Sequence, residues 1–294
     1  MKRGPRHAIT SSRGSRLEAT VMKTWFVSGA SRGLGRSIVE AALGAGNRVL
    51  ASARDPKPLE PLLGRFGERL RLATLDVTDE AAAHAAVGLA VETFGGVDVV
   101  VNNAGYGDLG SVEDTSLDSF RRQIEANLIG TIIVTKAAIP VLRRQRSGHI
   151  VQVSSVGGRI GAPARAAYSA AKWGIEGFSE SLAREMALIG VHVTIVEPGG
   201  FRTGFAQAAH AADEGRPEYD AVVGAAIRMQ RDYDGRQPGD PAKAAAVVLK
   251  LADMNRPPLR IALGSDAVNA IAAADRLRLE ELETWRPLSV STDY

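Results

Sequence analysis

Residues 24–35 read TWFVSGASRGLG, in which a short apolar run leads directly into a glycine-rich turn. A helical pattern over Leu34–Ala45 follows, so the stretch predicts a buried strand, a tight turn and a helix. Gly29 suits the tight turn, whereas Gly33 and Gly35 leave room for a pyrophosphate near the backbone and for the helix against the sheet. The glycine spacing, GxxxGxG, does not by itself establish a nucleotide site, because turns of small residues are common.

Short β-branched runs alternate with longer helical patterns through the rest of the chain. The predicted strands are Thr24–Val27, Arg48–Ala51, Arg71–Leu75, Val97–Val101, Ile150–Val153, Val191–Val196 and Leu259–Leu263. The longer predicted helices are Leu34–Ala45, Glu80–Phe94, Leu117–Arg144 and Ala166–Leu188. Most of the strands are continuously apolar, which is typical of strands covered on both faces. The alternation predicts an α/β fold with a doubly wound, parallel, seven-stranded sheet of the Rossmann type.

The composition is that of a globular protein, with 45% hydrophobic and 23% charged residues among 294. There are no cysteines, which excludes disulfides, thiol nucleophiles and thiolate metal sites and is compatible with the cytoplasm that we predict. The longest apolar stretch, Leu128–Leu142, is interrupted by Lys136 and Pro140. We therefore expect no membrane span.

The first 21 residues differ in composition from the rest. They hold five Lys or Arg and one Glu, so residues 22–294 carry a net charge of −1 although the whole chain carries +3. The basic character belongs to this segment, and we expect no nucleic-acid partner for the fold. Residues 1–21 are predicted to be a disordered tail, with an upstream start codon or a targeting segment as alternatives. Residues 22–294 are predicted to form one domain.

Further motifs follow the glycine-rich turn. Asn102-Asn103-Ala104-Gly105 comes directly after the fourth predicted strand. Tyr168 and Lys172 lie four residues apart on a helical pattern, about 40° apart around its axis and so on one face. A lysine ammonium favours the phenolate and lowers the pKa of a tyrosine from its usual value of about 10. Adjacent strand residues face opposite ways, so only one of Ser154 and Ser155 can face a substrate.

Together these motifs resemble the short-chain dehydrogenase/reductase family, in the branch with TGxxxGxG and YxxxK. The resemblance runs from Met22 to about Thr203, and Ser28 stands where the family usually has Thr. It implies that Tyr168 exchanges a proton with the substrate oxygen and that Ser155, selected by the family's spacing, hydrogen-bonds that oxygen. It implies that Lys172 lowers the pKa of Tyr168 and holds the nicotinamide ribose. It assigns to Asn127 the positioning of a water between Lys172 and solvent, and it requires no metal.

The resemblance also implies a nicotinamide coenzyme, bound near the carboxyl ends of the strands. The residues predicted to contact it are Ser28, Gly29, Ser31, Arg32, Gly33, Leu34, Gly35, Arg54, Asp76, Val77, Asn103, Ala104, Gly105, Tyr168, Lys172, Pro198, Gly199 and Thr203.

The second strand bears on which coenzyme is bound. The acidic position of the family falls on Ala53, and Asp55 precedes Pro56, where a turn role suits it. Arg54 and Arg32 are suited to holding a 2′-phosphate through charge-assisted hydrogen bonds. The alternative is that both are solvated surface arginines. The sequence thus favours NADP(H), with NAD(H) as the alternative.

The pattern weakens after Gly200 and resumes near Asp240. By resemblance, residues 201–234 should form a mobile C-terminal substrate lid, whose lining is expected to include Phe201, Phe205, Met229 and Tyr233. The predicted function is a hydride-transferring oxidoreductase acting on a small carbonyl compound or secondary alcohol. An NAD-dependent alcohol dehydrogenase and a non-catalytic nucleotide-sensing scaffold are the alternatives. The resemblance further implies a homodimer or homotetramer, formed through the helices that begin at Leu117 and Ala166.

Overall fold

The computed structural model describes residues 22–205 and 215–294. The predicted tail and part of the predicted lid lie outside these residues. All seven strands pair in parallel in a single sheet with the order β3-β2-β1-β4-β5-β6-β7. Their bounds are β1 (Thr24–Val27), β2 (Arg48–Ala53), β3 (Leu70–Thr74), β4 (Val99–Asn102), β5 (Gly148–Val153), β6 (Val191–Pro198) and β7 (Arg260–Leu263). The predicted fold class is confirmed, and the strand order reverses between β1 and β4, where ligands of such sheets bind.

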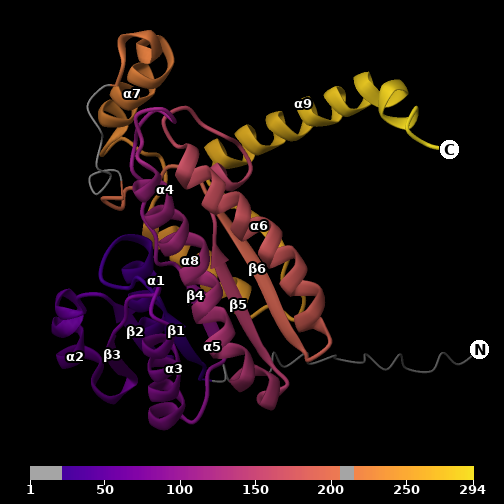
Figure 1. Ribbon diagram of the computed structural model, residues 1–294. Coiled ribbons are helices and arrows are strands. Elements are labelled where there is room, and N and C mark those ends of the chain that lie inside the picture. Colours follow the sequence, from indigo (N-terminus) through magenta and orange to yellow (C-terminus); the bar gives the residue numbers. More distant parts are fainter. Residues whose placement is uncertain (1–21, 206–214) are drawn as a thin grey trace, which may run out of the picture.

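Helices cover both faces of the sheet (Figure 1). The helices are α1 (Gly33–Gly44), α2 (Glu60–Phe66), α3 (Glu80–Phe94), α4 (Leu117–Ile124), α5 (Gly130–Gln145), α6 (Ala166–Ala187), α7 (Ala225–Tyr233), α8 (Pro241–Ala252) and α9 (Ser265–Val290). One face packs against α1, α2 and α8, and the other against α3, α5 and α6.

The first strand shows why the strands are continuously apolar. Trp25 and Val27 belong to the hydrophobic cluster beneath α1 and α8, whereas Phe26 belongs to the cluster beneath α3 and α5. All three side chains are buried. Successive side chains of a strand point to opposite faces, and both faces of this sheet are covered, so both sets must be apolar.

The predicted helix Leu117–Arg144 is interrupted. A π-helical turn, η3 (Glu125–Ile129), separates α4 from α5. By length and composition, the segment Leu117–Gln145 is apolar enough to cross a membrane, with a mean hydropathy of 1.4. This corrects the expectation that no stretch would be, because two charged residues within an 18-residue window do not bring its mean hydropathy below that of a membrane span. In the fold, 44% of its most apolar window is buried. Helix α5 packs in the core, on the face of the sheet that α3 and α6 also cover. A core helix meets the same criterion.

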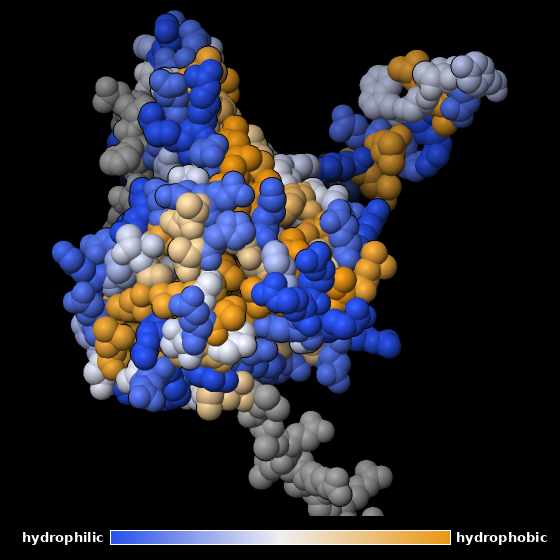
Figure 2. Space-filling view, turned by 60° about the horizontal axis from the view of Figure 1, so that its bottom comes forward, coloured by the Kyte–Doolittle hydropathy of each residue, from blue (hydrophilic) through white to orange (hydrophobic). Residues whose placement is uncertain are grey.

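Two elements stand away from the sheet. The short turns η5 (Pro217–Tyr219) and η6 (Asp220–Gly224) lead into α7, which packs through Ile227 against Leu109 and Ala164. The 26-residue helix α9 buries only Ala267 and Ile271, and its later turns extend away from the body (Figures 1 and 2).

Candidate functional site

The glycine-rich turn is packed against the turn that follows β4. Gly29 has a φ of +63°, and a Cβ placed on it would lie 2.6 Å from the Cα of Ala104. A Cβ on Gly35 would run into the side-chain amide of Asn103. Both glycines are therefore required for contact between the two turns, because any larger residue would push the backbones apart.

Ser28 fastens these two turns together. Its buried hydroxyl accepts hydrogen bonds from the backbone N–H groups of Asn103 (3.1 Å) and Ala104 (3.2 Å). In return, the side-chain amide of Asn103 donates to the carbonyls of Ser28 (3.1 Å) and Gly29 (3.0 Å). The side chain of Ser28 is thus used within the protein, which gives a physical reason for a hydroxyl at this position apart from any contact with a coenzyme.

The N-terminus of α1 is suited to an anion. No side chain caps the N-terminus of α1, where Arg32 precedes the helix, and the first turn of α1 holds no acidic residue. The first N–H groups of a helix have no partner within it and carry partial positive charge. Thr203 lies beside this turn, since a Cβ on Gly33 would be 3.1 Å from its Cβ. The glycine-rich turn and Thr203, both among the predicted coenzyme contacts, therefore meet, and the residues present fit a pyrophosphate.

The end of β2 lies next to the same turn. The N–H of Ala30 donates to the carbonyl of Ser52 at 2.9 Å, so residues 31–32 and 53–54 leave from neighbouring points. Arg32 and Arg54 are both exposed. Asp55 accepts a hydrogen bond from the N–H of Lys57 (3.1 Å), which is the predicted turn role. This corner thus has two exposed cations, and the carboxylate of Asp55 is engaged in a turn.

Asp76 and Val77 follow β3, which ends at Thr74. Hydrogen bonds from the backbone and then the side chain of Thr78 hold the pKa of Asp76 below its usual value, and the charge of Arg54 adds to this effect. Val77 is buried, and its side chain occupies the space that a Cβ on Gly130 would need. Its side chain is therefore part of the core.

Tyr168 and Lys172 lie one turn apart on α6, and both are buried. The ammonium of Lys172 lies 5.6 Å from the centroid of the Tyr168 ring and donates to the carbonyl of Val153 at 2.8 Å. The ring is held between two glycines: a Cβ on Gly107 would lie 2.8 Å from it, and one on Gly157 would lie 3.2 Å from it. This packing fixes the ring before any ligand binds.

The two serines at the end of β5 face different neighbours. Ser155 lies on the side of Tyr168, and its hydroxyl accepts from the N–H of Gly157 at 3.0 Å. The hydroxyl of Ser154 is buried on the side of Glu176. Of the two, the structure therefore brings Ser155 to the tyrosine, as the spacing of the motif predicts.

Burial changes the acidity of both α6 residues. It raises the pKa of Tyr168, and hydrogen bonding to Ser155 and the charge of Arg165 act in the opposite direction. It lowers the pKa of Lys172 to about 8, against the opposing charge of Glu176 one turn further along the helix. A buried lysine with this pKa changes protonation state close to neutral pH.

Asn127 lies in the π-helical turn η3 and is fully buried. Its amide nitrogen donates to the carbonyls of Tyr106 and Gln123, each at 2.8 Å, and its amide oxygen accepts from the N–H of Tyr106. A Cβ on Gly105 would run into this oxygen and would lie 3.7 Å from the ammonium of Lys172. The structure thus brings Asn127 close to Lys172, and π-turns often occur at functional sites.

The region after β6 contains a residue that the sequence did not indicate. Asp266, in the first turn of α9, accepts a hydrogen bond from the N–H of Gly200 at 2.7 Å, and its carboxylate fills the space that a Cβ on Gly199 would need. The turn after Pro198 is therefore positioned by a helix 66 residues away, a separation at which no sequence pattern connects the two.

Three of the four side chains expected to line the lid lie in contact with other parts of this region. Phe205 lies with its ring 5.8 Å from that of Tyr168, the hydroxyl of Tyr233 lies against Gly200, and Phe201 pairs with Gly239. Met229 is 68% exposed, so the structure does not bring it to this region. It lies on the outer side of a helix whose inner side is taken by Ile227. Residues 206–214 of the predicted lid lie outside the described residues.

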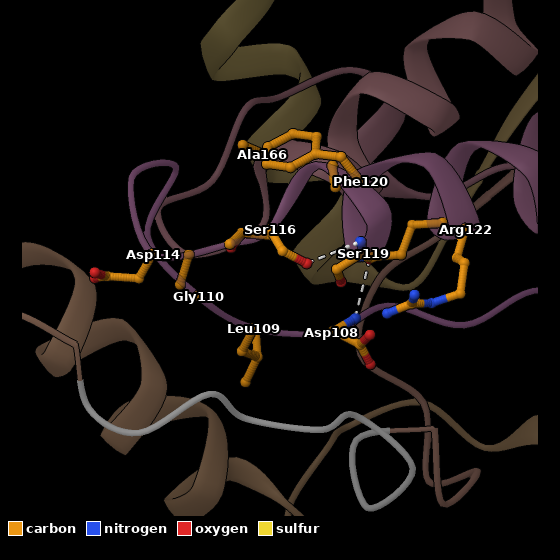
Figure 3. A pocket seen from close by; sticks show the side chains of 13 residues that line it. Asp108, Leu109, Gly110, Asp114, Ser116, Ser119, Phe120, Arg122 and Ala166 are labelled. Carbon is orange, nitrogen blue, oxygen red and sulfur yellow. Dashed lines mark hydrogen bonds between the residues drawn. The ribbon is translucent and has the colours of Figure 1, made fainter.

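A hollow of about 400 Å³ lies beside the candidate catalytic residues, between the loop after β4 and the first turns of α4 and α6 (Figure 3). Asp108, Ser116 and Phe120 are among the side chains around it. None of Asn127, Ser155, Tyr168 and Lys172 lines it. The hollow therefore neighbours the candidate active site without being part of it.

Comparison with known proteins agrees with this geometry. The family model described as short chain dehydrogenase matches residues 23–214. Oxidoreductase BOA17 of Botryotinia fuckeliana is 46% identical over 271 residues, which are 92% of this chain and 99% of the relative. A short-chain dehydrogenase from Streptomyces avermitilis has a TM-score of 0.86 at 38% identity, covering 93% of this chain and all of that one. An alcohol dehydrogenase from Thermococcus sibiricus complexed with 5-hydroxy-NADP has a TM-score of 0.68 at 25% identity, covering 82% of this chain and 96% of that one.

Proposed function

The chain belongs to the short-chain dehydrogenase family of NAD(P)-dependent oxidoreductases, and we propose that it interconverts a carbonyl group and a secondary alcohol with Tyr168 as the general acid and base. The observation that carries this proposal is the buried pair of Tyr168 and Lys172 on one face of α6, with Ser155 beside the tyrosine. The bound coenzyme supplies or accepts the hydride, which carries two electrons.

The protein supplies or accepts the proton that accompanies the hydride. In the reducing direction, the phenol of Tyr168 donates its proton to the carbonyl oxygen, which becomes the hydroxyl of the product. Ser155 donates a hydrogen bond to that oxygen as negative charge develops on it. The ammonium of Lys172 stabilises the tyrosine phenolate that remains, and a proton from solvent on the Asn127 side restores the phenol. Oxidation of an alcohol runs through the same groups in reverse.

We propose a preference for NADP(H) over NAD(H). Ala53 ends β2 without a carboxylate that would accept from ribose hydroxyls or repel a phosphate. Arg54 and Arg32 are exposed on the two segments joined by the Ala30–Ser52 hydrogen bond. Guanidinium groups bind phosphate through two parallel hydrogen bonds. The remaining predicted coenzyme contacts, among them Ser31, Leu34, Pro198 and Gly199, belong to the same proposal.

The cellular setting is part of the proposal as well. We propose a small-molecule substrate, a cytoplasmic location and a homodimer or homotetramer, with no membrane or nucleic-acid partner. The absence of cysteine supports the cytoplasmic location, and the near-neutral charge of residues 22–294 supports the proposal that nucleic acid is not a partner. Exposed apolar residues on the helices, such as Leu117 and Trp173, support an interface between copies.

Titration of the purified chain with NADPH and NADH, followed by nicotinamide fluorescence, tests this function. Tighter binding of NADPH, followed by turnover of a panel of carbonyl compounds, is the expected result. Tighter binding of NADH with alcohol oxidation would favour an NAD-dependent alcohol dehydrogenase instead. Coenzyme binding without turnover of any carbonyl or alcohol would favour the non-catalytic scaffold.

A further inference from the structure

Arg165 lies between the candidate catalytic tyrosine and the lid helix α7. It is the residue immediately before α6, three residues before Tyr168. Its guanidinium carbon lies 5.8 Å from the centroid of the Tyr168 ring. Its Nη2 donates to the side-chain oxygen of Gln230 on α7 at 2.8 Å. A positive charge thus lies next to the group that is proposed to exchange the proton.

This charge has no carboxylate partner within residues 22–205 and 215–294. Arg159 and Arg260, which are also partly buried, pair with carboxylates: Arg159 with Glu197, and Arg260 with Glu176 and Glu180. Arg48, Arg69 and Arg71 are partly buried as well and donate to backbone carbonyls. Arg165 is partly buried, and its hydrogen-bond partner, Gln230, is neutral. Burial lowers the pKa of Arg165, and only the charge of an ionised Tyr168 opposes this. A desolvated cation without a counter-charge costs free energy, and an anion brought by a ligand would offset that cost.

The backbone before Arg165 is held in an unfavourable conformation. Ala164 has a φ of +63°, which is costly for a residue with a Cβ. Its carbonyl accepts from the N–H of Gly110 at 3.0 Å, and its side chain packs with Leu109 and Ile227. The surrounding contacts maintain this strain, and the strained turn leads directly into Arg165. Strain of this kind is concentrated at ligand-binding sites.

We propose that Arg165 binds a carboxylate of the substrate, so that the chain acts on oxo acids and the corresponding hydroxy acids. This inference rests on the proposed oxidoreductase function. One hydrogen of Nη2 is donated to Gln230, and its second hydrogen, together with a hydrogen of Nε or of Nη1, can bind the two oxygens of one planar carboxylate. The carboxylate takes no part in the redox step, in which an oxo acid, NAD(P)H and one proton give a hydroxy acid and NAD(P)⁺. Its role is to place the carbonyl group at Tyr168.

The test compares each acid with its neutral ester. The probes are 4-acetylbenzoate and 5-oxohexanoate, each with its methyl ester, and kcat/KM is measured with reduced coenzyme. We expect the wild-type chain to prefer the acids by at least about tenfold, because an ester leaves the cation unpaired. Arg165→Met should reduce the acid-to-ester ratio by roughly 10- to 100-fold, and Arg165→Lys should reduce it less. Arg184→Met, an exposed position on the same helix, should leave the ratio unchanged.

Different results would contradict the carboxylate proposal and the oxidoreductase function. Equal kcat/KM for acid and ester in the wild-type chain would overturn the carboxylate, even if Arg165→Met failed to fold. An equal loss for acid and ester in Arg165→Met, with a shifted pH profile for both, would make Arg165 a partner of Tyr168 only. Preference for 4-acetylphenyl phosphate over 4-acetylbenzoate would identify a phosphate instead. Turnover of the esters with no preference for the acids would leave the oxidoreductase function standing, whereas absence of coenzyme binding would remove that function first.

Discussion

The proposed catalytic corner, at Tyr168 and Lys172, and the proposed coenzyme corner, at Arg32 and Arg54, are built differently. At the catalytic corner, Tyr168 and Lys172 are buried, the ring is held between two glycines, and the ammonium is fixed on the carbonyl of Val153. At the coenzyme corner, Arg32 and Arg54 are exposed and extend from the ends of two neighbouring segments. The first corner is fixed by packing, whereas the second presents charge to solvent.

This difference has energetic consequences. Groups fixed in a dry environment have altered pKa values and interact strongly, because the local dielectric constant is low. Groups exposed to water keep their charge, and each contributes little until a ligand of opposite charge arrives. Substitutions in the catalytic corner should therefore change rates by large factors, whereas those in the coenzyme corner should change selectivity by smaller ones.

The largest effect is expected for Tyr168→Phe, which removes the hydroxyl and keeps the ring between its glycines. We expect kcat to fall on the order of 10³-fold, because general acid catalysis is lost. The affinity for coenzyme, measured by nicotinamide fluorescence, should change little. Tyr294→Phe, at a fully exposed position outside the predicted lid, serves as the control. Turnover at the wild-type rate in Tyr168→Phe would remove this residue from its proposed role.

Lys172→Met should separate catalysis from stability. At pH 7 we expect turnover to fall by roughly 10- to 100-fold, and the pH at which alcohol oxidation becomes half-maximal should rise, since the charge that favours the phenolate is gone.

Lys172→Met should lower turnover but raise the stability of the fold at neutral pH. The unfolded chain keeps the lysine proton up to pH 10.5, whereas the folded chain releases it near pH 8. Below pH 8 the buried charge costs about 3 kcal/mol, and this cost disappears as the pH rises from 8 to 10.5. Lys172→Met should therefore unfold at higher denaturant concentration than the wild-type chain at pH 7, and this difference should shrink toward pH 10. A variant less stable at pH 7 would contradict the argument, and Lys250→Met is the exposed control.

A smaller effect, on the choice of coenzyme, is expected for substitutions in the coenzyme corner. Arg54→Ala should weaken NADPH binding by about tenfold, with little change for NADH, because an exposed arginine contributes one charge-assisted contact to a phosphate. Fluorescence titration with both coenzymes measures the ratio. Arg256→Ala, an exposed arginine in the loop before β7, should not change it. Equal losses for the two coenzymes would mean that Arg54 does not select between them.

The smallest effect on function is expected for Ser28, which joins the glycine-rich turn to the turn after β4. Ser28→Ala removes the acceptor for the N–H groups of Asn103 and Ala104. We expect the free energy of unfolding to fall by about 1–3 kcal/mol, while the ratio of NADPH to NADH affinity stays the same. Ser28→Thr, which keeps the hydroxyl, should restore the stability. Denaturant titration and coenzyme titration together would show whether Ser28 acts on the fold or on the ligand.

Much of the architecture follows from local sequence. Runs such as Thr24–Val27 are apolar on both alternating sets of side chains, so they had to lie in the middle of a covered parallel sheet. The four-residue spacing of Tyr168 and Lys172 placed them on one helical face before any contact was known. Asp55 was predicted as a turn residue because it precedes a proline, and its hydrogen bond to Lys57 agrees with this.

Tertiary structure alone decided the rest. The π-turn that carries Asn127, the strained Ala164 before Arg165, and the contact of Asp266 with the turn at Gly199 depend on segments far apart in the chain. A sequence pattern records which faces are apolar, because burial acts on each residue according to its own position in a helix or strand. It does not record how neighbouring segments distort one another, since that follows from close packing between them.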